Sequence, residues 1–473
     1  MSRVRVAGAA INQTPLDWSG NLTRICDAIE RAREEEVSIL CLPELCITGY
    51  GCEDAFHSPS LHRTALEVLH ECAAATKGML VSVGLPLFHQ SAVFNCACLL
   101  ADGKIVGFVP KRYLASEGLH YEPRWFRPWP AGVRDRIHIG GQWYPIGDYV
   151  FDVGGIRIGF EICEDAWVPH RPGAELAARG VDIILNPSAS HFSFGKHEIR
   201  KRFVVEGSRS FRVGYVYANL LGNEAGRVIY DGGVLIATAG QLLAAGPRFA
   251  FQPVVVTAAS VDVEMNRMSR ARSAGFQPGL ALDRDVTISI PWSYPDVEPR
   301  FEHPHVASWE LGPHVKEEEF TRAVMLGLFD YLRKSRAQGF VVSVSGGADS
   351  SAVACLVALM IEASYNELGH EGFCQALAHI PELRTTKSHQ QRISRLLHGL
   401  YQATRNSSEA TRDAATTLVT SLGGTMSCIS IDEIVHKYVR TIEEVLGFKL
   451  NWNDHDLALQ NIQARARGPS AWL

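Results

Sequence analysis

The stretch FVVSVSGGADSS at residues 340–351 decides the predicted fold of the second half of the chain. Its apolar, β-branched start predicts a strand, and the apolar pattern of residues 352–360 predicts a helix. The Ser/Gly loop between them would let the backbone approach an anion near the unpaired N–H groups and the dipole of the helix start. The loop has no lysine, so it is not the loop of ordinary P-loop kinases. The stretch therefore predicts an ATP site in an α/β fold, with an ordinary Gly-rich turn as the alternative.

Length and composition limit the class of protein. A chain of 473 residues exceeds one ordinary core, so we expect two domains. Its hydrophobic content of 46% and net charge of −5 are typical of a soluble globular protein without affinity for nucleic acid. We identify no apolar run long enough for a membrane span. Eleven cysteines without CxxC spacing, and a start without a signal-peptide core, favour a cytoplasmic protein with neither disulfides nor zinc.

The first half of the chain alternates predicted strands and helices, which indicates an α/β domain over residues 1–275. The helix at 22–35 lies between strands at 4–10 and 38–42, and further strands are predicted at 79–85, 94–100, 156–162, 181–185, 215–219, 233–237 and 254–263. Residues 276–316 are rich in Pro, Trp, Arg and His and are predicted as a linker. The second domain, 317–473, begins with an amphipathic helix at 317–334.

Three residues with complementary chemistry follow predicted strands of the first domain: Glu44, Lys111 and Cys163. Open α/β sheets bind ligands at the carboxyl ends of their strands, so we expect the three side chains to meet there. A thiolate attacks acyl carbons, a carboxylate can take its proton, and an ammonium can stabilise an oxyanion. Taken singly, the residues would be a buried cysteine, a solvated lysine and a turn glutamate, but together they predict amide hydrolysis.

The segments at 40–45, 107–111 and 156–165 resemble the nitrilase superfamily, which cleaves carbon–nitrogen bonds in an αββα sandwich. The resemblance implies that Glu44 is the general base, Lys111 stabilises the transition state and Cys163 is the nucleophile. It also implies that Glu122 is the second glutamate that braces many nitrilase sites.

The loop Ser-Gly-Gly-x-Asp-Ser resembles that of the ATP-pyrophosphatase superfamily, whose members adenylate a carbonyl oxygen and release pyrophosphate. This resemblance implies an incomplete doubly wound, Rossmann-like domain that binds ATP. The residues expected to bind ATP are Ser343, Val344, Ser345, Gly346, Gly347, Ala348, Asp349 and Ser350. Ser345 is also a catalytic candidate, and Asp349 is the candidate ligand for Mg²⁺ on the pyrophosphate.

The two halves together resemble the glutamine-dependent NAD synthetases, and residues 111–118 and 122–126 are similar to the branch of that family found in eukaryotes and some bacteria. The resemblance implies that ammonia from glutamine travels internally to deamido-NAD that ATP has adenylated, giving NAD, AMP and pyrophosphate. It implies Ser188 and Arg202 as glutamine contacts and Asn461 as a deamido-NAD contact. Other bacterial members carry Tyr where this chain has Glu117, so that glutamine contact does not transfer.

Only three strands are predicted after residue 340, at 340–344, 375–380 and 426–431, where a doubly wound fold usually has about five. Family members continue beyond residue 473, so we expect an intact amidase beside a C-terminally truncated ligase. Two alternatives remain: a stand-alone nitrilase-type amidase with a ligase remnant, and a non-catalytic subunit that binds dinucleotide or assembles with a complete synthetase. By analogy with nitrilases, we expect a homo-oligomer formed through the first domain.

Overall fold

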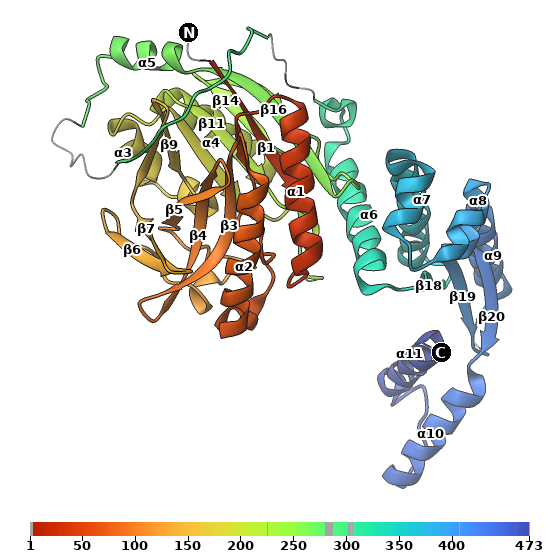
Figure 1. The fold of residues 1–473 in the computed structure, drawn as a ribbon. Helices are drawn as coiled ribbons and strands as arrows, with labels where there is room; N and C mark the ends of the chain where they lie inside the picture. The colour runs from red at the N-terminus through yellow and green to blue at the C-terminus, as the bar shows by residue number, and fades with distance from the viewer. Residues whose placement is uncertain are drawn as a thin grey trace. The chain divides into compact units, whose positions relative to one another are not determined.

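The computed structural model describes residues 3–224, 226–279, 287–300, 304, 306–405 and 407–472. The chain forms two compact units, Met1–Leu326 and Gly327–Leu473, which Figure 1 colours from red to blue along the chain. The division falls inside helix α6 (Val315–Ser335), so the backbone passes from one unit to the other within a helix.

The first unit contains two large sheets. The first has the strand order β16-β1-β2-β3-β4-β5-β7-β6. Its strands are β1 (Arg3–Ile11), β2 (Ile39–Cys41), β3 (Leu80–His89), β4 (Ala92–Ala101), β5 (Lys104–Pro110), β6 (Arg134–Ile139), β7 (Gln142–Gly147) and β16 (Val254–Asp262). Strands β1, β2 and β3 are parallel, and the antiparallel steps β3–β4 and β4–β5 bring β5 back to the same direction.

The second sheet has the order β15-β14-β11-β10-β9-β8-β17. Its strands are β8 (Val150–Val153), β9 (Ile156–Phe160), β10 (Ile183–Ser188), β11 (Gly214–Asn219), β14 (Leu235–Thr238), β15 (Gln241–Ala245) and β17 (Thr287–Ile290). Strands β9, β10 and β11 are parallel. A short hairpin, β12 (Leu221–Asn223) with β13 (Ile229–Asp231), completes the strands of this unit among the described residues.

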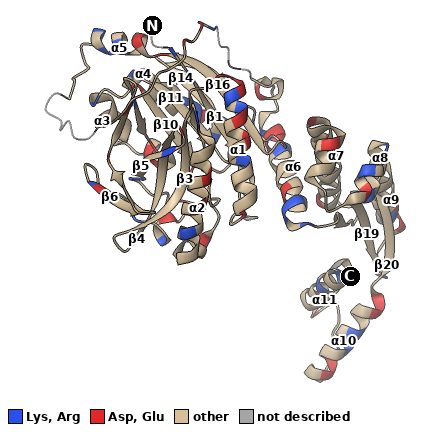
Figure 2. Cartoon of the chain, in the orientation of Figure 1, with Lys and Arg blue, Asp and Glu red and all other residues tan. Residues whose placement is uncertain are grey.

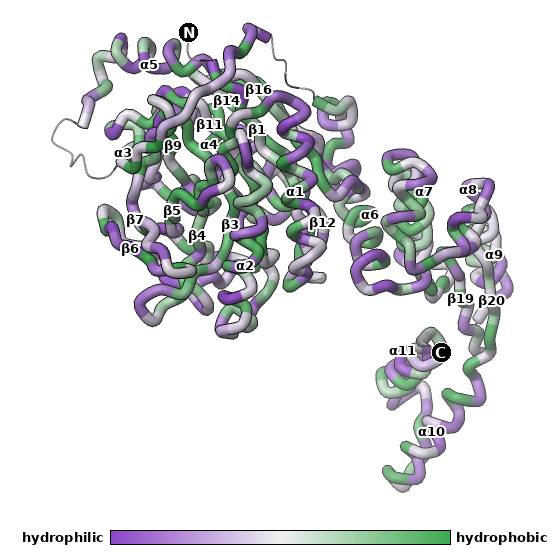
Figure 3. Tube along the Cα trace, viewed as in Figure 1, coloured by the Kyte–Doolittle hydropathy of each residue, from purple (hydrophilic) through white to green (hydrophobic). Residues whose placement is uncertain are grey.

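The two sheets pack face to face, with helices on both outer faces. One apolar core joins residues from both sheets, including Val6, Leu99, Ile158 and Val216. A second core packs α1 (Trp18–Glu34) and α2 (Pro59–Ala75) on the first sheet, and a third packs α3 (Pro172–Ala178) and α4 (Lys196–Phe211) on the other. Figure 3 shows the corresponding apolar colour on the strands and mixed colour on the helices. The predicted αββα sandwich is confirmed.

The strands and the helix predicted in residues 1–263 are present, but one element departs from the expected domain organisation. Helix α5 (Val263–Arg272) ends the first half of the chain. Strand β17 lies within the predicted linker and pairs in parallel with β8, so the linker contributes a strand to the sandwich. Part of this linker lies outside the described residues.

The second unit contains a parallel sheet with the order β18-β19-β20, formed by β18 (Phe340–Ser343), β19 (Leu397–Ala403) and β20 (Thr425–Ser430). Its helices are α7 (Ala348–Ala376), α8 (His389–Leu396), α9 (Glu409–Leu422), α10 (Asp432–Leu446) and α11 (Asp456–Trp472). The unit therefore has the Rossmann-like arrangement expected. The strand predicted at 375–380 is wrong, because α7 continues to Ala376 and a turn follows. A short apolar run at the end of a buried helix cannot be told from a strand by its pattern.

Helix α7 is long and apolar enough, by length and composition, to cross a membrane. A helix packed inside a folded unit passes the same test, and α7 buries Val357, Met360 and Ile361 within the second unit. Figure 2 shows both signs of charge scattered over each unit, as the small net charge implies. The absence of membrane and nucleic-acid partners stays a prediction.

Candidate active site and nucleotide site

The three residues of the predicted triad follow strands that run in the same direction within their sheets. Glu44 follows β2, Lys111 follows β5 directly, and Cys163 comes shortly after β9. Gly84 on β3 makes room for the Glu44 loop, because a Cβ there would lie 2.3 Å from the backbone nitrogen of Leu45. The first sheet thus supplies the carboxylate and the ammonium, and the second sheet supplies the thiol.

Cys163 has an unusual backbone. It begins a 3-10 helix, Cys163–Ala166, with a φ of +45°, in the left-handed region that costs a non-glycine residue about 1–3 kcal/mol. The carboxylate of Asp165 accepts a hydrogen bond from the Ile162 N–H at 2.9 Å and another from the Tyr113 N–H at 2.9 Å. These bonds help to hold the strained turn that carries the thiol.

The ammonium of Lys111 joins two carboxylates in a fully buried cluster. Its Nζ lies 2.6 Å from Oε1 of Glu44 and 2.8 Å from Oε1 of Glu122. Glu44 also accepts hydrogen bonds from the side chain of Asn95 at 2.7 Å and from the backbone N–H of Ala189 at 3.0 Å. The structure therefore brings together Glu44, Lys111 and Glu122 as the sequence predicts, and adds Asn95, which no sequence pattern indicates.

Glu122 is held as firmly as Glu44. Its Oε1 accepts a hydrogen bond from the hydroxyl of Tyr50 at 2.7 Å, and its Oε2 accepts one from the Ala115 N–H at 3.0 Å. The carboxylate sits at the start of the 3-10 helix Glu122–Arg124. Glu122 is thus fixed by an element that also carries an exposed arginine, Arg124, at its other end.

Burial dominates the electrostatics of the cluster. It raises the pKa of Glu44 to about 7, helped by the charge of Glu122 and opposed by Lys111. Burial alone would lower the pKa of Lys111, but the two carboxylates outweigh it and hold that pKa well above its ordinary value. Burial and the charge of Glu44 raise the pKa of the Cys163 thiol. A thiol with a raised pKa is protonated at rest, so it needs a base when it attacks, and Glu44 is poised for that near neutral pH.

The segment after β10 lies against the triad and is fixed by a buried arginine. Arg200 on α4 donates to the carbonyl oxygens of Ser190 and His191, both at 2.7 Å, and pairs with Asp231 at 2.6 Å. Because the neighbouring Ala189 N–H binds Glu44, Arg200 positions the backbone that holds the catalytic carboxylate.

The two predicted glutamine contacts differ in location. Ser188 is buried at the end of β10, where its hydroxyl donates to Oδ1 of Asn186 at 2.6 Å. Arg202 is exposed on α4, and among the described residues the structure gives it no partner in the triad. Two residues earlier, Arg200 lies on the buried face of the same helix, since residues two positions apart project to roughly opposite sides of a helix.

A chain of polar rings leads outward from Glu122. The hydroxyl of Tyr50 lies 3.2 Å from Nδ1 of His120, and Nε2 of His120 lies 2.7 Å from Nδ1 of His191. Burial lowers the pKa of both histidines to about 4, helped by Lys196, so both rings are neutral at neutral pH. Burial and Arg200 lower the pKa of Lys196 to about 8. The ammonium of Lys196 lies 5.5 Å from the ring centre of Trp167.

A cavity of about 60 Å³ lies beside Tyr50 and His120. Glu224, at its wall, accepts hydrogen bonds from the backbone N–H groups of Tyr50 and Gly51 at 3.2 and 2.7 Å. A space of this size holds only a few water molecules. These ring and carboxylate residues were not found from the sequence, because their proximity to the triad arises only from folding.

In the second unit, the predicted phosphate loop joins β18 to α7 as expected. Gly346 has a φ of +78°, and a Cβ at this position would lie 2.5 Å from the backbone oxygen of Thr411. The Ser345 N–H donates to Oγ of Ser350 at 3.2 Å, and the Ser351 hydroxyl donates to the Gly347 oxygen at 2.8 Å. The loop is therefore preformed, and its first glycine is required by conformation and by space.

The predicted ATP residues are not equally available to a ligand. Ser345, Gly347 and Asp349 are exposed, whereas Val344 is buried and its N–H donates to the Leu400 oxygen at 3.0 Å. Within the described ranges, no cluster of three or more His, Cys, Asp or Glu side chains could hold a metal ion. A single carboxylate such as Asp349 would suit Mg²⁺ only together with the phosphates of a nucleotide, which is how Mg²⁺ is commonly bound.

Asn461 lies exposed on α11, where its amide donates to the Leu457 oxygen of the same helix at 3.0 Å. Another residue connects α11 to the phosphate loop. The Gln402 amide nitrogen donates to the Arg467 oxygen at 2.7 Å, and its oxygen accepts from the Ser343 hydroxyl at 2.8 Å. Gln402 therefore joins the strand of the ATP loop to the helix that was expected to contact deamido-NAD.

Comparison with protein families gives one match for each half of the chain. Residues 3–270 match the carbon-nitrogen hydrolase family and residues 320–472 match the NAD synthase family. The first match contains the triad, and the second contains the phosphate loop.

Individual relatives match along the whole chain. The chain is 32% identical to a glutamine-dependent NAD(+) synthetase of Bos taurus and 32% identical to that of Saccharomyces cerevisiae, covering 100% and 99% of this chain and 70% of each relative. A crystal structure of a glutamine-dependent NAD(+) synthetase from Cytophaga hutchinsonii matches with a TM-score of 0.82 and 42% identity, over 100% of this chain and 72% of the other. The synthetase of Acinetobacter baumannii shares the fold, with a TM-score of 0.70 and 19% identity over 100% of this chain and 72% of that one.

Proposed function

The chain belongs to the family of glutamine-dependent NAD(+) synthetases, and we propose that it hydrolyses glutamine in its first unit to supply ammonia for the ATP-dependent amidation of deamido-NAD in its second. The observation that carries this proposal is the buried Glu44–Lys111–Glu122 cluster beside the Cys163 turn, in a chain that also carries the preformed phosphate loop. The alternative of a stand-alone amidase is not favoured, because the relatives match over both halves.

Glutamine hydrolysis would begin at Cys163. Glu44 takes the thiol proton as the sulfur attacks the carboxamide carbon, and Lys111 stabilises the oxyanion that forms. Protonation of the leaving nitrogen by Glu44 releases ammonia and leaves a glutamyl thioester. Water, deprotonated by Glu44, then attacks the thioester, and glutamate leaves as the thiol is restored.

Glu122 would act through Lys111. It balances the ammonium charge and fixes its position, so that Lys111 remains charged in a buried site. Lys196 is a half-buried cation that interacts electrostatically with Cys163, and we assign it, in place of the exposed Arg202, as a partner for the carboxylate of glutamine.

The second unit would bind ATP at the loop between β18 and α7. The serine hydroxyls and backbone N–H groups of residues 345–350 would hold its phosphates, with Asp349 as the protein ligand of a Mg²⁺ ion that neutralises phosphate charge. The adenylated nicotinate carboxylate of deamido-NAD then reacts with ammonia and releases AMP. Ser345 is the hydroxyl in this loop that we expect to contact the reacting phosphate.

Ammonia is largely protonated at neutral pH, so transfer away from bulk water preserves the nucleophile. We therefore expect internal transfer between the two sites. We also propose a cytoplasmic location, since the eleven free thiols suit a reducing compartment, and a homo-oligomer formed through the sandwich, by analogy with nitrilase-like proteins.

The experiment that tests this function measures glutamate release and NAD formation in the same reaction, with glutamine, ATP and deamido-NAD. The wild type should form both products, and Cys163→Ala should form neither from glutamine. Cys26→Ala removes a half-buried thiol on α1, the helix that covers the outer face of the first sheet, and serves as the matched control. If glutamate forms without NAD, only the amidase activity is supported. If neither glutamate nor NAD forms, the result favours a non-catalytic subunit.

A further inference from the structure

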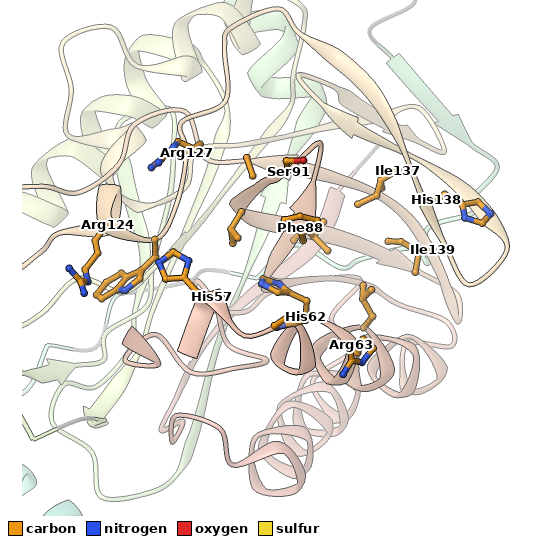
Figure 4. Close-up of a pocket in the computed structure, with 16 residues that line it drawn as sticks. His57, His62, Arg63, Phe88, Ser91, Arg124, Arg127, Ile137, His138 and Ile139 are labelled. Atoms are coloured by element: carbon orange, nitrogen blue, oxygen red, sulfur yellow. The ribbon is translucent and has the colours of Figure 1, made fainter. Parts of the chain in front are cut away.

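A separate cavity of about 490 Å³ lies in the first unit, between α2, the ends of β3 and β4, β6 and the turn after Glu122–Arg124 (Figure 4). We call it the Phe88 pocket. Its size is within the usual range of small-molecule sites, about 300–1,000 Å³. None of the triad residues lines it, so it is not part of the glutamine site.

The floor of the Phe88 pocket is apolar. Leu87, Val93, Ile137 and Ile139 are buried there, while Phe88 at the rim keeps 57% of its surface exposed. An exposed aromatic ring beside a concave apolar floor offers surface that a ligand with a flat apolar body can cover.

The charge of the pocket has one sign. Three arginines and three histidines line it, and no carboxylate does. Asp54 balances Arg124 through two hydrogen bonds of 2.7 and 2.8 Å. Arg127 donates only to the carbonyl oxygens of Pro123 and Phe126, and Arg63 has no ion-pair partner in the described part of the chain. Two positive charges therefore remain unbalanced.

These two charges flank the aromatic rim. In Figure 4, Arg127 and Arg63 lie on opposite sides of Phe88, so an anion could be attracted at either end of the pocket. A two-fold axis passing through the pocket would place its arginines opposite the same arginines of a second copy, which is unfavourable. The pattern fits a small ligand better than self-association.

We propose that the Phe88 pocket is a binding site for a small organic anion with an apolar, preferably aromatic, body. The apolar floor would cover the body, and Arg63 and Arg127 would attract the carboxylate, sulfonate or phosphate. The site would be close in sequence to the reaction centre, because the 3-10 helix that begins with Glu122 ends at Arg124, and Arg124 and the next residue, Trp125, line the pocket.

The test uses the full-length chain and two fluorescent probes with the same aromatic body. These are 8-anilinonaphthalene-1-sulfonate, which is an anion, and N-phenyl-1-naphthylamine, which is neutral. We expect saturable binding of the anion to one site. Arg63→Ala and Arg127→Ala should each weaken it roughly threefold, as for exposed charge pairs, and the double variant about tenfold. Phe88→Ala should weaken the binding of both probes.

Arg209→Ala is the matched control, because Arg209 is an exposed arginine on α4 outside the pocket and should leave the affinity unchanged. Competition separates the ligand sources: benzoate should displace the anionic probe at lower concentration than inorganic phosphate. The proposal is overturned if the anion shows no saturable binding, if the two arginine variants bind it as the wild type does, if Phe88→Ala has no effect, or if phosphate competes as well as benzoate.

Discussion

Glu122 carries a negative charge that changes how Glu44 titrates. Burial and this charge raise the pKa of Glu44 to about 7, so its basic form is present mainly above that pH. The rate of glutamine hydrolysis, as kcat/KM, should therefore rise with pH through about 7 and then level off.

Replacing Glu122 tests this coupling. Glu122→Gln removes a charge that raises the pKa of Glu44, so the rising limb of the pH profile should move to lower pH, with a lower plateau because Lys111 is less well held. A pH profile of glutamate release from wild type and variant checks it. Glu44→Gln should lower the rate about 10²- to 10⁴-fold on the plateau above pH 7, where the wild-type Glu44 is in its basic form. If the rising limb of the pH profile stays at the same pH in Glu122→Gln, Glu122 only holds Lys111 in place and does not change the pKa of Glu44.

Single residues also show what the sequence could predict. The triad was found because each member follows a strand and has distinctive chemistry. Asn95 was missed because nothing in its own strand distinguishes an amide that binds Glu44 from one that faces solvent. Arg202 was placed in the glutamine site from resemblance alone, whereas helix periodicity directs Arg200 inward instead.

At the scale of elements, the loop between β18 and α7 depends on one glycine more than the other. Gly346→Ala places a Cβ 2.5 Å from the Thr411 oxygen at a φ of +78°, so the loop must distort. Gly347→Ala meets only the Ser345 hydroxyl, at 3.3 Å, and serves as control. We expect ATP binding to fall at least tenfold in the first variant and to change little in the second, measured by calorimetry. Equal losses would contradict the geometric argument.

Asp231 joins three elements by buried ion pairs. It lies on β13 and binds Arg200 of α4 at 2.6 Å and Arg248 at 3.2 Å, and Arg248 binds Glu319 of α6 at 2.7 Å. Although burial opposes it, the two arginines hold the pKa of Asp231 below its ordinary value, so the pairs are lost only when the pH falls to that lowered pKa.

Asp231→Asn should lower the free energy of unfolding by about 3–5 kcal/mol, because two buried guanidinium groups lose their shared charge partner. Chemical denaturation at pH 7 measures the loss. Glu206→Gln, at an exposed pair on α4, should cost less than about 1 kcal/mol in the same assay. A loss as small for Asp231→Asn would mean that water reaches the pairs.

The elements themselves were predicted unevenly. The strands that were predicted in the sandwich are continuous apolar runs, as expected when both faces of a strand are covered, whereas β6, β7, β8 and β15 were not predicted. In the second unit, β19 was not predicted as a strand: its sequence, LHGLYQA, mixes polar and small residues, since its order depends on pairing with β18 and β20. Strand β17 was hidden in a proline-rich stretch because it is an edge strand, paired with β8 alone among the described residues.

For the whole molecule, the two activities should be separable by the source of ammonia. Cys163→Ala should make no NAD from glutamine but should make it from ammonium chloride with ATP and deamido-NAD, at a rate that increases with pH as more free ammonia forms. NAD measured by absorbance in a coupled assay checks this result. If ammonium fails in the variant and in the wild type alike, the second unit does not complete the ligase reaction in this chain.

The ion pairs of Arg248 determine where the chain can be truncated to give a stable hydrolase fragment. Glu310 and Glu319 both pair with this buried arginine, and Glu319 belongs to the helix that continues into the other unit. A chain ended at 275 would lose both acids and β17, and one ended at 316 would lose Glu319. Soluble, active hydrolase is therefore expected only from fragments that include the opening turns of α6. In this chain the division between the hydrolase unit and the ligase unit lies inside α6. A gene fusion or exchange made within residues 276–316 would therefore remove contacts that the hydrolase unit needs.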